Sequence, residues 1–309
     1  MNGEPLVSIL IPAYHERFFA EALASACAQD YPALEIVVRD DSMGESIERV
    51  ARQAADARVR YVRNDRRLGF HGNFTACFGD ARGEYVKFLN DDDRLHPRCV
   101  AVLAGVLRVN PSVALATSRR AVIDAAGRHL PDREATMPLS LVSALVPGAE
   151  LANFVLMNMR NLIGEPSTVL FRRADVVAEA GSLFRWGGED YHCLADLGLW
   201  LRLLARGAAF YCAEALSEFR VHDAQEQGTE AGSLSCLLER RRLARRAREA
   251  GFLAGPGQYA AALQAARAFA AATDFTRTSP EVAAQVRAEL AAIDEEIGRI
   301  GGAAVPAPL

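Results

Sequence analysis

Apolar and polar positions alternate in blocks along the first half of this chain. Short continuous apolar runs, which are typical of strands buried on both faces, occupy 6–11, 34–38, 59–62, 85–89 and 113–117. The segments between them carry apolar residues at helical spacing and predict helices over 18–28, 46–55, 74–81 and 99–109. This β-α-β pattern predicts an α/β fold, with a mostly parallel, doubly wound sheet covered by helices on both faces.

The chain changes character after about residue 230. Before that point, two short apolar runs at 208–212 and 217–221 predict two further strands. Beyond it, 237–250 is strongly basic, while 256–273 and 280–300 are Ala-rich with helical spacing and begin near a proline. We therefore predict an α/β domain over 1–228, with halves of about 1–118 and 119–228, and a helical C-terminal region over 229–309.

Composition and charge bound the class of protein. Half of the 309 residues are apolar and 24% are charged, so the chain can bury a large core. The formal net charge of −4 gives no global basic field, and we expect no nucleic-acid partner. The sequence contains neither a basic leader nor the ~20 consecutive apolar residues of a membrane helix. This predicts a cytoplasmic protein and leaves open peripheral attachment to the inner face of the membrane.

Six cysteines are scattered along the chain. No two of them have the Cys-x-x-Cys spacing of a zinc site, and the chain is not a small secreted domain stapled by disulfides. We therefore expect reduced cysteines within the core.

Polar clusters follow several of the predicted strands. Tyr14 comes after the first strand, Asp41 after the second, and the acidic run 90–93 after the strand at 85–89. Since ligands of open parallel sheets bind outside the carboxyl ends of the strands, we expect a shared pocket lined by Tyr14, Asp41 and Asp92. Two simpler roles remain open, because Asp41 could begin a turn or cap a helix and Tyr14 could be a half-buried aromatic.

Three consecutive aspartates, 91–93, end the strand at 85–89. Their mutual repulsion raises the cost of ionising them, and a divalent cation would relieve it. Mg²⁺ typically combines one or two carboxylates with the phosphates of a substrate. The chain has no G-x-x-x-x-G-K-[ST] loop and no G-x-G-x-x-G after its first strand, which argues against a P-loop ATPase and an NAD enzyme.

Four runs, in order, resemble glycosyltransferase family 2: VSILIPAYHE, ALASACAQDYPALEIVVRDDS, GFHGNF and ARGEYVKFLNDDDRLHP. The resemblance covers roughly residues 5–225. It implies a Rossmann-like GT-A fold and an inverting, metal-dependent hexosyltransferase-type enzyme using Mn²⁺ or Mg²⁺. The donor would be a nucleoside-diphosphate sugar, with UDP-sugar favoured. The acceptor would be a hydroxyl of a saccharide or a lipid-linked saccharide, in bacterial surface polysaccharide biosynthesis.

The resemblance also assigns residues to the donor site. It implies that Tyr14 and Asp41 contact the base, that Asp91 contacts the ribose, and that Asp92 binds the metal. Because Asn90 replaces an aspartate that many relatives carry, a pairing of Asp91 with Asp93 remains open. The other donor-side candidates are Pro12, Glu16, Arg67, Gly69 and Asn73 for the nucleotide, and Asp93 and His222 for the metal.

The run ADLGLWLRLLARG resembles the family's E-D-x-x-L-W-x-R helix and implies that Asp196 is the catalytic base. Apolar residues at helical spacing behind Asp196 would dock this helix on the sheet and hold the carboxylate rigidly. Ala195 stands where relatives carry glutamate, so the upstream pair Glu189 and Asp190, in a loop that we expect to be flexible, remains the rival. A simpler role for Asp196 is a favourable interaction with the helix dipole.

Two further alternatives stay open. The basic segment 237–250 either packs on the catalytic domain or in a homodimer with its arginines solvated, or lies on an anionic membrane. Since Asn90 and Ala195 each replace an acid, the chain could also be a catalytically silent protein that binds a nucleotide-sugar.

Overall fold

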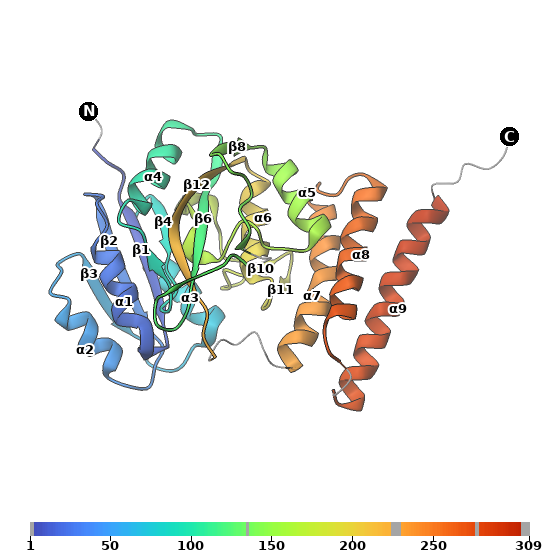
Figure 1. The fold of residues 1–309 in the computed structure, drawn as a ribbon, viewed down its shortest axis with the longest axis horizontal. Coiled ribbons are helices and arrows are strands. Elements are labelled where there is room, and N and C mark those ends of the chain that lie inside the picture. The colour runs from blue at the N-terminus through green and yellow to red at the C-terminus, as the bar shows by residue number, and fades with distance from the viewer. Residues whose placement is uncertain (1–2, 134–135, 224–229, 276–277, 304–309) are drawn as a thin grey trace.

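The structure is a computed structural model, which describes residues 3–133, 136–223, 230–275 and 278–303 (Figure 1). One large mixed sheet runs through its α/β part, with strand order β3-β2-β1-β4-β9-β6-β12-β5. The first four strands of this order are parallel: β1 (Val7–Ala13), β2 (Leu34–Asp40), β3 (Val59–Arg63) and β4 (Tyr85–Phe88). The predicted α/β class is confirmed.

Apolar packing on both faces explains the unbroken apolar runs. In β1, Ile9 and Ile11 belong to one core cluster and Leu10 to another, because successive side chains of a strand point to opposite faces. The helices that cover these faces are α1 (Glu16–Cys27), α2 (Ser46–Gln53), α3 (Gly69–Gly79) and α4 (Cys99–Val109). Helix α3 begins five residues before the predicted start, because its first turn contains two glycines that the sequence pattern assigns to a loop.

The second half extends the sheet with strands of both directions. Strand β6 (Val113–Ile123) runs parallel to β12 (Ala208–Arg220), and β9 (Leu170–Arg172) is antiparallel to β4 and β6. The two strands predicted at 208–212 and 217–221 are wrong as separate elements. They form the single strand β12, whose irregular register between Cys212 and Ser217 breaks the apolar pattern.

The remaining elements of this part are β5 (Arg94–Leu95), β7 (His129–Leu130), β8 (Ala144–Val146), α5 (Gly148–Asn158), η2 (Pro166–Thr168), η3 (Arg173–Asp175), β10 (Arg185–Trp186), β11 (Glu189–Asp190) and α6 (Ala195–Leu204). They include three short strands of the same sheet, since β5 and β8 pair with β12 and β7 pairs with β6.

A tight hairpin replaces the flexible loop predicted around Glu189 and Asp190. Strands β10 and β11 pair antiparallel across Gly187 and Gly188, whose φ angles are +62° and +84°. Two consecutive left-handed residues form the turn that suits a two-residue hairpin, and glycine adopts this conformation without strain.

The described residues of the C-terminal region form the helices α7 (Glu230–Glu249), α8 (Pro256–Ala272) and α9 (Pro280–Ala303). Leu243 of α7 and Leu263 of α8 belong to the same core cluster as Phe74 and Trp200 of the α/β part. The C-terminal helices therefore share a hydrophobic core with the α/β part. The predicted boundary between residues 228 and 229 lies outside the described residues.

The arginines of α7 make contacts within the protein. Arg240 lies 4.0 Å from the ring centroid of Phe269 and Arg248 4.4 Å from that of Tyr259, while Arg241 pairs with Glu289 at 2.6 Å. Such contacts favour the packed alternative for 237–250 over the membrane-bound one. No helix within the described ranges has the length and apolar character needed to cross a bilayer.

Candidate active site

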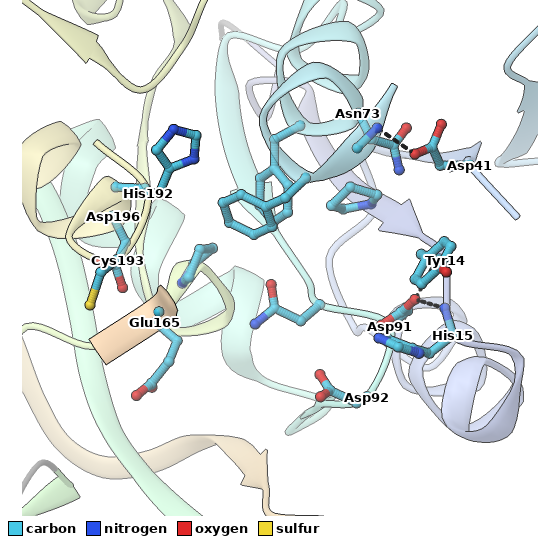
Figure 2. A pocket seen from close by; sticks show the side chains of 18 of the residues that line it. Tyr14, His15, Asp41, Asn73, Asp91, Asp92, Glu165, His192, Cys193 and Asp196 are labelled. Carbon is cyan, nitrogen blue, oxygen red and sulfur yellow. Dashed lines mark hydrogen bonds between the residues drawn. The ribbon is translucent and has the colours of Figure 1, made fainter. Parts of the chain in front are cut away.

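A cavity of about 390 Å³ opens at the carboxyl ends of β1, β2 and β4, between the sheet and the segments around α6 and α7 (Figure 2). It brings together most of the residues predicted from the sequence, namely Pro12, Tyr14, Asp41, Arg67, Gly69, Asn73, Asp91, Asp92, Asp196 and His222. The other predicted residues, Glu16, Asp93, Glu189 and Asp190, are not among those that line it.

Asp91 joins the end of β1 to the acidic run. Its Oδ2 accepts the backbone N–H groups of Tyr14 and His15, each at 2.6 Å. Burial is the main cause that raises the pKa of Asp91 to about 7; the neighbouring charge of Asp92 raises it too, while the two N–H groups act in the opposite direction. The same carboxylate therefore fixes the backbone that presents Tyr14 to the cavity.

Asp41 organises the loop that enters α3. Its Oδ1 accepts hydrogen bonds from Leu68 N and Asn64 Nδ2, both at 2.7 Å, and its Oδ2 accepts one from Gly69 N at 2.8 Å. Gly69 has a φ of +71°, a conformation that favours glycine. The guanidinium of Arg67, from the same loop, lies 4.4 Å from the ring centroid of Tyr14.

The aspartates of the acidic run face different surroundings. Asp92 lines the cavity, and its Oδ2 lies 3.1 Å from Nε2 of His222. Asp93 is buried and accepts hydrogen bonds from Ser167 Oγ at 2.6 Å and Arg220 N at 3.0 Å. Burial, together with the charge of Asp92, raises the pKa of Asp93 well above its usual range. Asp93 therefore holds the acidic run in place through hydrogen bonds in the interior, while Asp92 faces the cavity.

The donor atoms at Asp92 and His222 fit a cation that shares its ligands with a substrate. Within the described ranges, no three His, Cys, Asp or Glu side chains gather closely enough to enclose a metal ion. One carboxylate oxygen and one imidazole nitrogen do meet at the cavity wall. Mg²⁺ sites that include substrate phosphates take one or two carboxylates from the protein, so the carboxylate of Asp92 is compatible with a cation that shares its ligands with a substrate.

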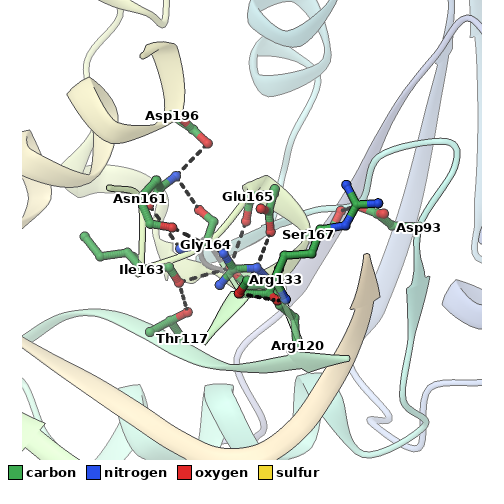
Figure 3. A network of polar contacts seen from close by, with 12 residues as sticks. Asp93, Thr117, Arg120, Arg133, Asn161, Ile163, Gly164, Glu165, Ser167 and Asp196 are labelled. Atoms are coloured by element: carbon green, nitrogen blue, oxygen red, sulfur yellow. Dashed lines mark hydrogen bonds and ion pairs between the residues drawn. The ribbon is translucent and has the colours of Figure 1, made fainter. Parts of the chain in front are cut away.

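Asp196 lies in the first turn of α6, at the other end of the cavity from Tyr14 (Figure 2), and Figure 3 shows the polar contacts around it. Its Oδ2 accepts a hydrogen bond from Asn161 Nδ2 at 2.7 Å and its Oδ1 one from Leu197 N at 2.7 Å. Burial is the main cause that raises the pKa of Asp196 to about 7, and the nearby carboxylate of Glu165 adds to it. The buried guanidinium of Arg120 pairs with Glu165 at 2.6 Å.

The rival acids lie elsewhere. Asp190 forms an ion pair with Arg185, which lowers the pKa of the carboxyl. Glu189 accepts a hydrogen bond from the hydroxyl of Tyr191 at 3.1 Å. Of the three candidate bases, the structure brings only Asp196 to the cavity wall.

Several residues at the cavity were not predicted from the sequence. Glu165 lies in the run GEPS, where the only local signal for it is an acid beside a proline. Phe70 follows Gly69 and is 47% exposed at the cavity. His192, Cys193, Ser235 and Cys236 also line the cavity. Nothing in the local pattern connects the last two with the site, since α7 is far along the chain from the acidic run.

The expectation of six reduced cysteines is wrong. Cys193 and Cys236 form a disulfide across 43 residues of sequence, because α7 packs beside the segment that enters α6. The sequence pattern hides this pair, since only the tertiary fold brings the two residues together.

The disulfide leads to a direct chemical prediction. Denatured without reductant, the purified chain should react with iodoacetamide only at Cys27, Cys77, Cys99 and Cys212. After reduction all six cysteines should react, and mass spectrometry distinguishes the two states. Labelling of Cys193 and Cys236 in the unreduced, air-exposed protein would contradict the bond.

Comparisons with known proteins agree with this architecture. The family model described as glycosyl transferase family 2 matches residues 8–172, more than half of the chain. An uncharacterised protein of Mycobacterium tuberculosis, MT1568, is 31% identical over 255 residues, covering 78% of this chain and 75% of the relative. A second relative is the GalNAc(5)-diNAcBac-PP-undecaprenol beta-1,3-glucosyltransferase of Campylobacter jejuni, 35% identical over 95 residues, which is 29% of this chain and 31% of that protein.

The fold also matches a solved structure. Residues 1–349 of TarS from S. aureus, in complex with UDP-GlcNAc, align with a TM-score of 0.66 and 15% identity, over 96% of this chain and 82% of that chain. This likeness confirms the predicted GT-A-like sheet and its flanking helices. The extent of the family match and the 31% identity to MT1568 show that the chain belongs to glycosyltransferase family 2 and is a glycosyltransferase enzyme.

Proposed function

We propose that the protein is an inverting glycosyltransferase that uses a divalent cation and a nucleoside-diphosphate sugar, with UDP-sugar as the favoured donor. The observation that carries this proposal is the single cavity lined by Tyr14, Asp41 and Asp92 on one side and Asp196 on the other (Figure 2). The acceptor is a hydroxyl of a saccharide or of a lipid-linked saccharide. The names of a colanic acid biosynthesis relative from Escherichia coli and of the undecaprenol-linked glucosyltransferase support a role in bacterial surface polysaccharide assembly.

On the donor side, the base of the nucleotide lies against Tyr14 and Asp41, and Asp91 contacts the ribose. Asp92 and His222 would hold Mg²⁺ or Mn²⁺, and the cation would supply positive charge to the departing diphosphate. Arg67, above the ring of Tyr14, adds a positive side chain to the same rim of the cavity.

On the acceptor side, Asp196 takes the proton from the attacking hydroxyl. Its first-turn position and its hydrogen bond from Asn161 fix the carboxylate at the cavity wall. A pKa of about 7 makes it a stronger base than an ordinary aspartate, and general bases work best when their pKa lies near the working pH. Attack opposite the leaving diphosphate in one displacement inverts the anomeric carbon.

The raised pKa gives a pH prediction. Because only the ionised form of Asp196 accepts a proton, kcat/KM for the acceptor should fall about tenfold for each pH unit below the pKa of about 7 in the free enzyme, and should level off above it. Steady-state rates between pH 5.5 and 8.5 test this, with nucleotide binding measured over the same range as the control. A flat profile of kcat/KM across pH 6 to 8 would contradict a base with this pKa.

The proposal is tested first by ligand binding and then by transfer. A thermal-shift panel of UDP, dTDP, GDP, CDP and ADP, each with Mg²⁺, Mn²⁺ or EDTA, should show one nucleotide that stabilises the fold only with metal. The corresponding nucleotide-sugars are then assayed with saccharide and lipid-linked acceptors. Metal-dependent stabilisation without transfer to any acceptor would identify a silent nucleotide-sugar-binding protein, while no stabilisation by any nucleotide would contradict the donor site.

A further inference from the structure

Helix α7 of the C-terminal region reaches the cavity beside Asp196. Ser235 and Cys236 of α7 line the cavity together with His192 and Cys193, which lie just before α6. Figure 2 shows His192 and Cys193 next to Asp196, on the side of the cavity opposite Tyr14. The family model ends at residue 172, so it covers neither α6 nor α7.

A carboxylate of α7 holds the segment that enters α6. The side chain of Glu239 is fully buried, and its Oε1 and Oε2 accept the backbone N–H groups of His192 at 3.0 Å and Leu194 at 2.9 Å. The hydroxyl of Ser235 donates a third hydrogen bond to Glu239 at 2.7 Å. Across the described part of the chain, no lysine, arginine or histidine forms an ion pair with this carboxylate.

Packing alone does not account for Glu239. Burying a carboxylate without a cation is costly, and an apolar side chain such as that of the neighbouring Leu237 or Leu243, both buried, would fill the same interior at lower cost. What the carboxylate adds is two acceptors, aimed at two backbone N–H groups of one short segment. The role of the Glu239 carboxylate is therefore to fix the segment that enters α6.

The segment held by Glu239 leads directly into the turn that carries Asp196. Leu194 is the residue that precedes α6, and its own side chain makes no capping hydrogen bond. Glu239 supplies the acceptor from α7 instead, two residues before Asp196. The disulfide between Cys193 and Cys236 links the same two elements at the same place.

We infer that Glu239 is a positioning residue for Asp196: it fixes the entry to α6 through the N–H groups of His192 and Leu194 and thereby orients the base. This inference rests on the proposed function, in which Asp196 takes the proton from the acceptor. It gives the C-terminal region a part in the reaction, although Glu239 itself touches no substrate.

The test compares Glu239→Ala and Glu239→Gln with the parent enzyme. Glu239→Ala removes both acceptors, and a displacement of the base by about 1 Å lowers kcat by about 100-fold. Glu239→Gln keeps one acceptor oxygen and should lose about tenfold, again because of displacement. The KM for the donor should stay within about twofold, since the donor side is built from the first half of the chain and the change acts on the base. Hydrogen exchange at the amides of His192 and Leu194 should speed up in both variants.

A matched control removes another buried carboxylate bound to α7. Glu289 of α9 accepts two hydrogen bonds from Arg241 of α7, at 2.6 and 2.9 Å, and forms no hydrogen bond with the entry to α6 among the described residues. Glu289→Ala should keep the parental kcat. An equal loss of kcat in Glu289→Ala, or a parental kcat in Glu239→Ala and Glu239→Gln, would overturn the inference.

The exchange measurement separates this inference from the proposed function. If the parent enzyme transfers no sugar, the proposed function fails, while faster amide exchange in the Glu239 variants would still establish the structural link. If the parent transfers sugar and the exchange of His192 and Leu194 is unchanged in Glu239→Ala, the positioning role is wrong. If Glu239→Ala does not fold, Glu239→Gln, which keeps the shape of the side chain, decides by the same measurements.

Discussion

Asp196→Asn is expected to lower kcat by about 10³-fold while leaving metal-dependent nucleotide binding intact. Asparagine has nearly the same shape and keeps an oxygen that can accept hydrogen bonds, but it cannot take a proton from an acceptor hydroxyl. Loss of a positioned general base typically costs 10²–10⁴-fold. The donor side lies across the cavity, around Tyr14 and Asp41, so the thermal shift with nucleotide and metal should match that of the parent (Figure 2).

The rival acids provide matched controls. Asp190→Asn breaks the ion pair with Arg185 and Glu189→Gln alters a hydrogen bond with Tyr191, but neither side chain lines the cavity. Both variants should keep kcat within about threefold, as expected of surface changes away from the chemistry. Parental transfer by Asp196→Asn, or a loss in Asp190→Asn that equals the loss expected at Asp196, would move the base to the β10–β11 hairpin.

Unfolding does not explain the expected loss in Asp196→Asn. Folding raises the pKa of Asp196 to about 7, so its contribution to stability is fully present below the ordinary pKa of an aspartate and is lost as the pH rises through 7. Asparagine does not ionise, so the variant does not lose stability as the pH rises through 7. At pH 8 the variant should therefore be at least as stable as the parent, which a thermal melt checks directly.

The first half of the fold follows from the sequence because its signals are local. Unbroken apolar runs such as that of β1 report burial on both faces, and helix α4 has the predicted bounds 99–109. Strand β12 has the sequence pattern of two strands, because its irregular register between Cys212 and Ser217 interrupts the regular alternation of apolar and polar residues. The hairpin at Gly187 was also missed, although a Gly-Gly pair between short runs is a known hairpin signal.

The candidate site likewise has a part that the sequence predicts and a part that it does not. Tyr14, Asp41 and Asp92 could be placed together because each follows a parallel strand, and those strand ends meet at one rim of the sheet. The contributions of α7 could not be predicted, because helical periodicity shows which face of a helix is apolar but not which segment it will contact. Glu239 lies in the most basic stretch of the chain, where an isolated acid resembles a partner for the arginines beside it.

Asp92→Asn is expected to lower kcat by about 10²–10³-fold and to abolish the metal-dependent part of nucleotide binding. Asp92 lines the cavity within 3.1 Å of His222, so removing its charge removes the carboxylate from the proposed cation site. A divalent cation at a leaving group contributes several kcal/mol of transition-state stabilisation, and each 1.36 kcal/mol is tenfold in rate. The measurement is transfer over a series of Mn²⁺ and Mg²⁺ concentrations, combined with thermal shifts with and without EDTA.

Asp93 offers the comparison that separates binding a metal from supporting the loop. Asp93→Ala leaves the hydroxyl of Ser167 and the backbone N–H of Arg220 without their acceptor in the interior, which should lower the free energy of unfolding by about 2–4 kcal/mol. With nucleotide present, metal should still raise the melting temperature of Asp93→Ala. Asp92→Asn should melt at the parental temperature without ligands, and metal should not raise that temperature. The reverse outcome would make Asp93 the metal ligand and would support the alternative pairing of Asp91 with Asp93. A site of that kind would require Asp93 to turn from its buried hydrogen bonds toward the cavity, so its loss of stability and its loss of metal response would then occur together.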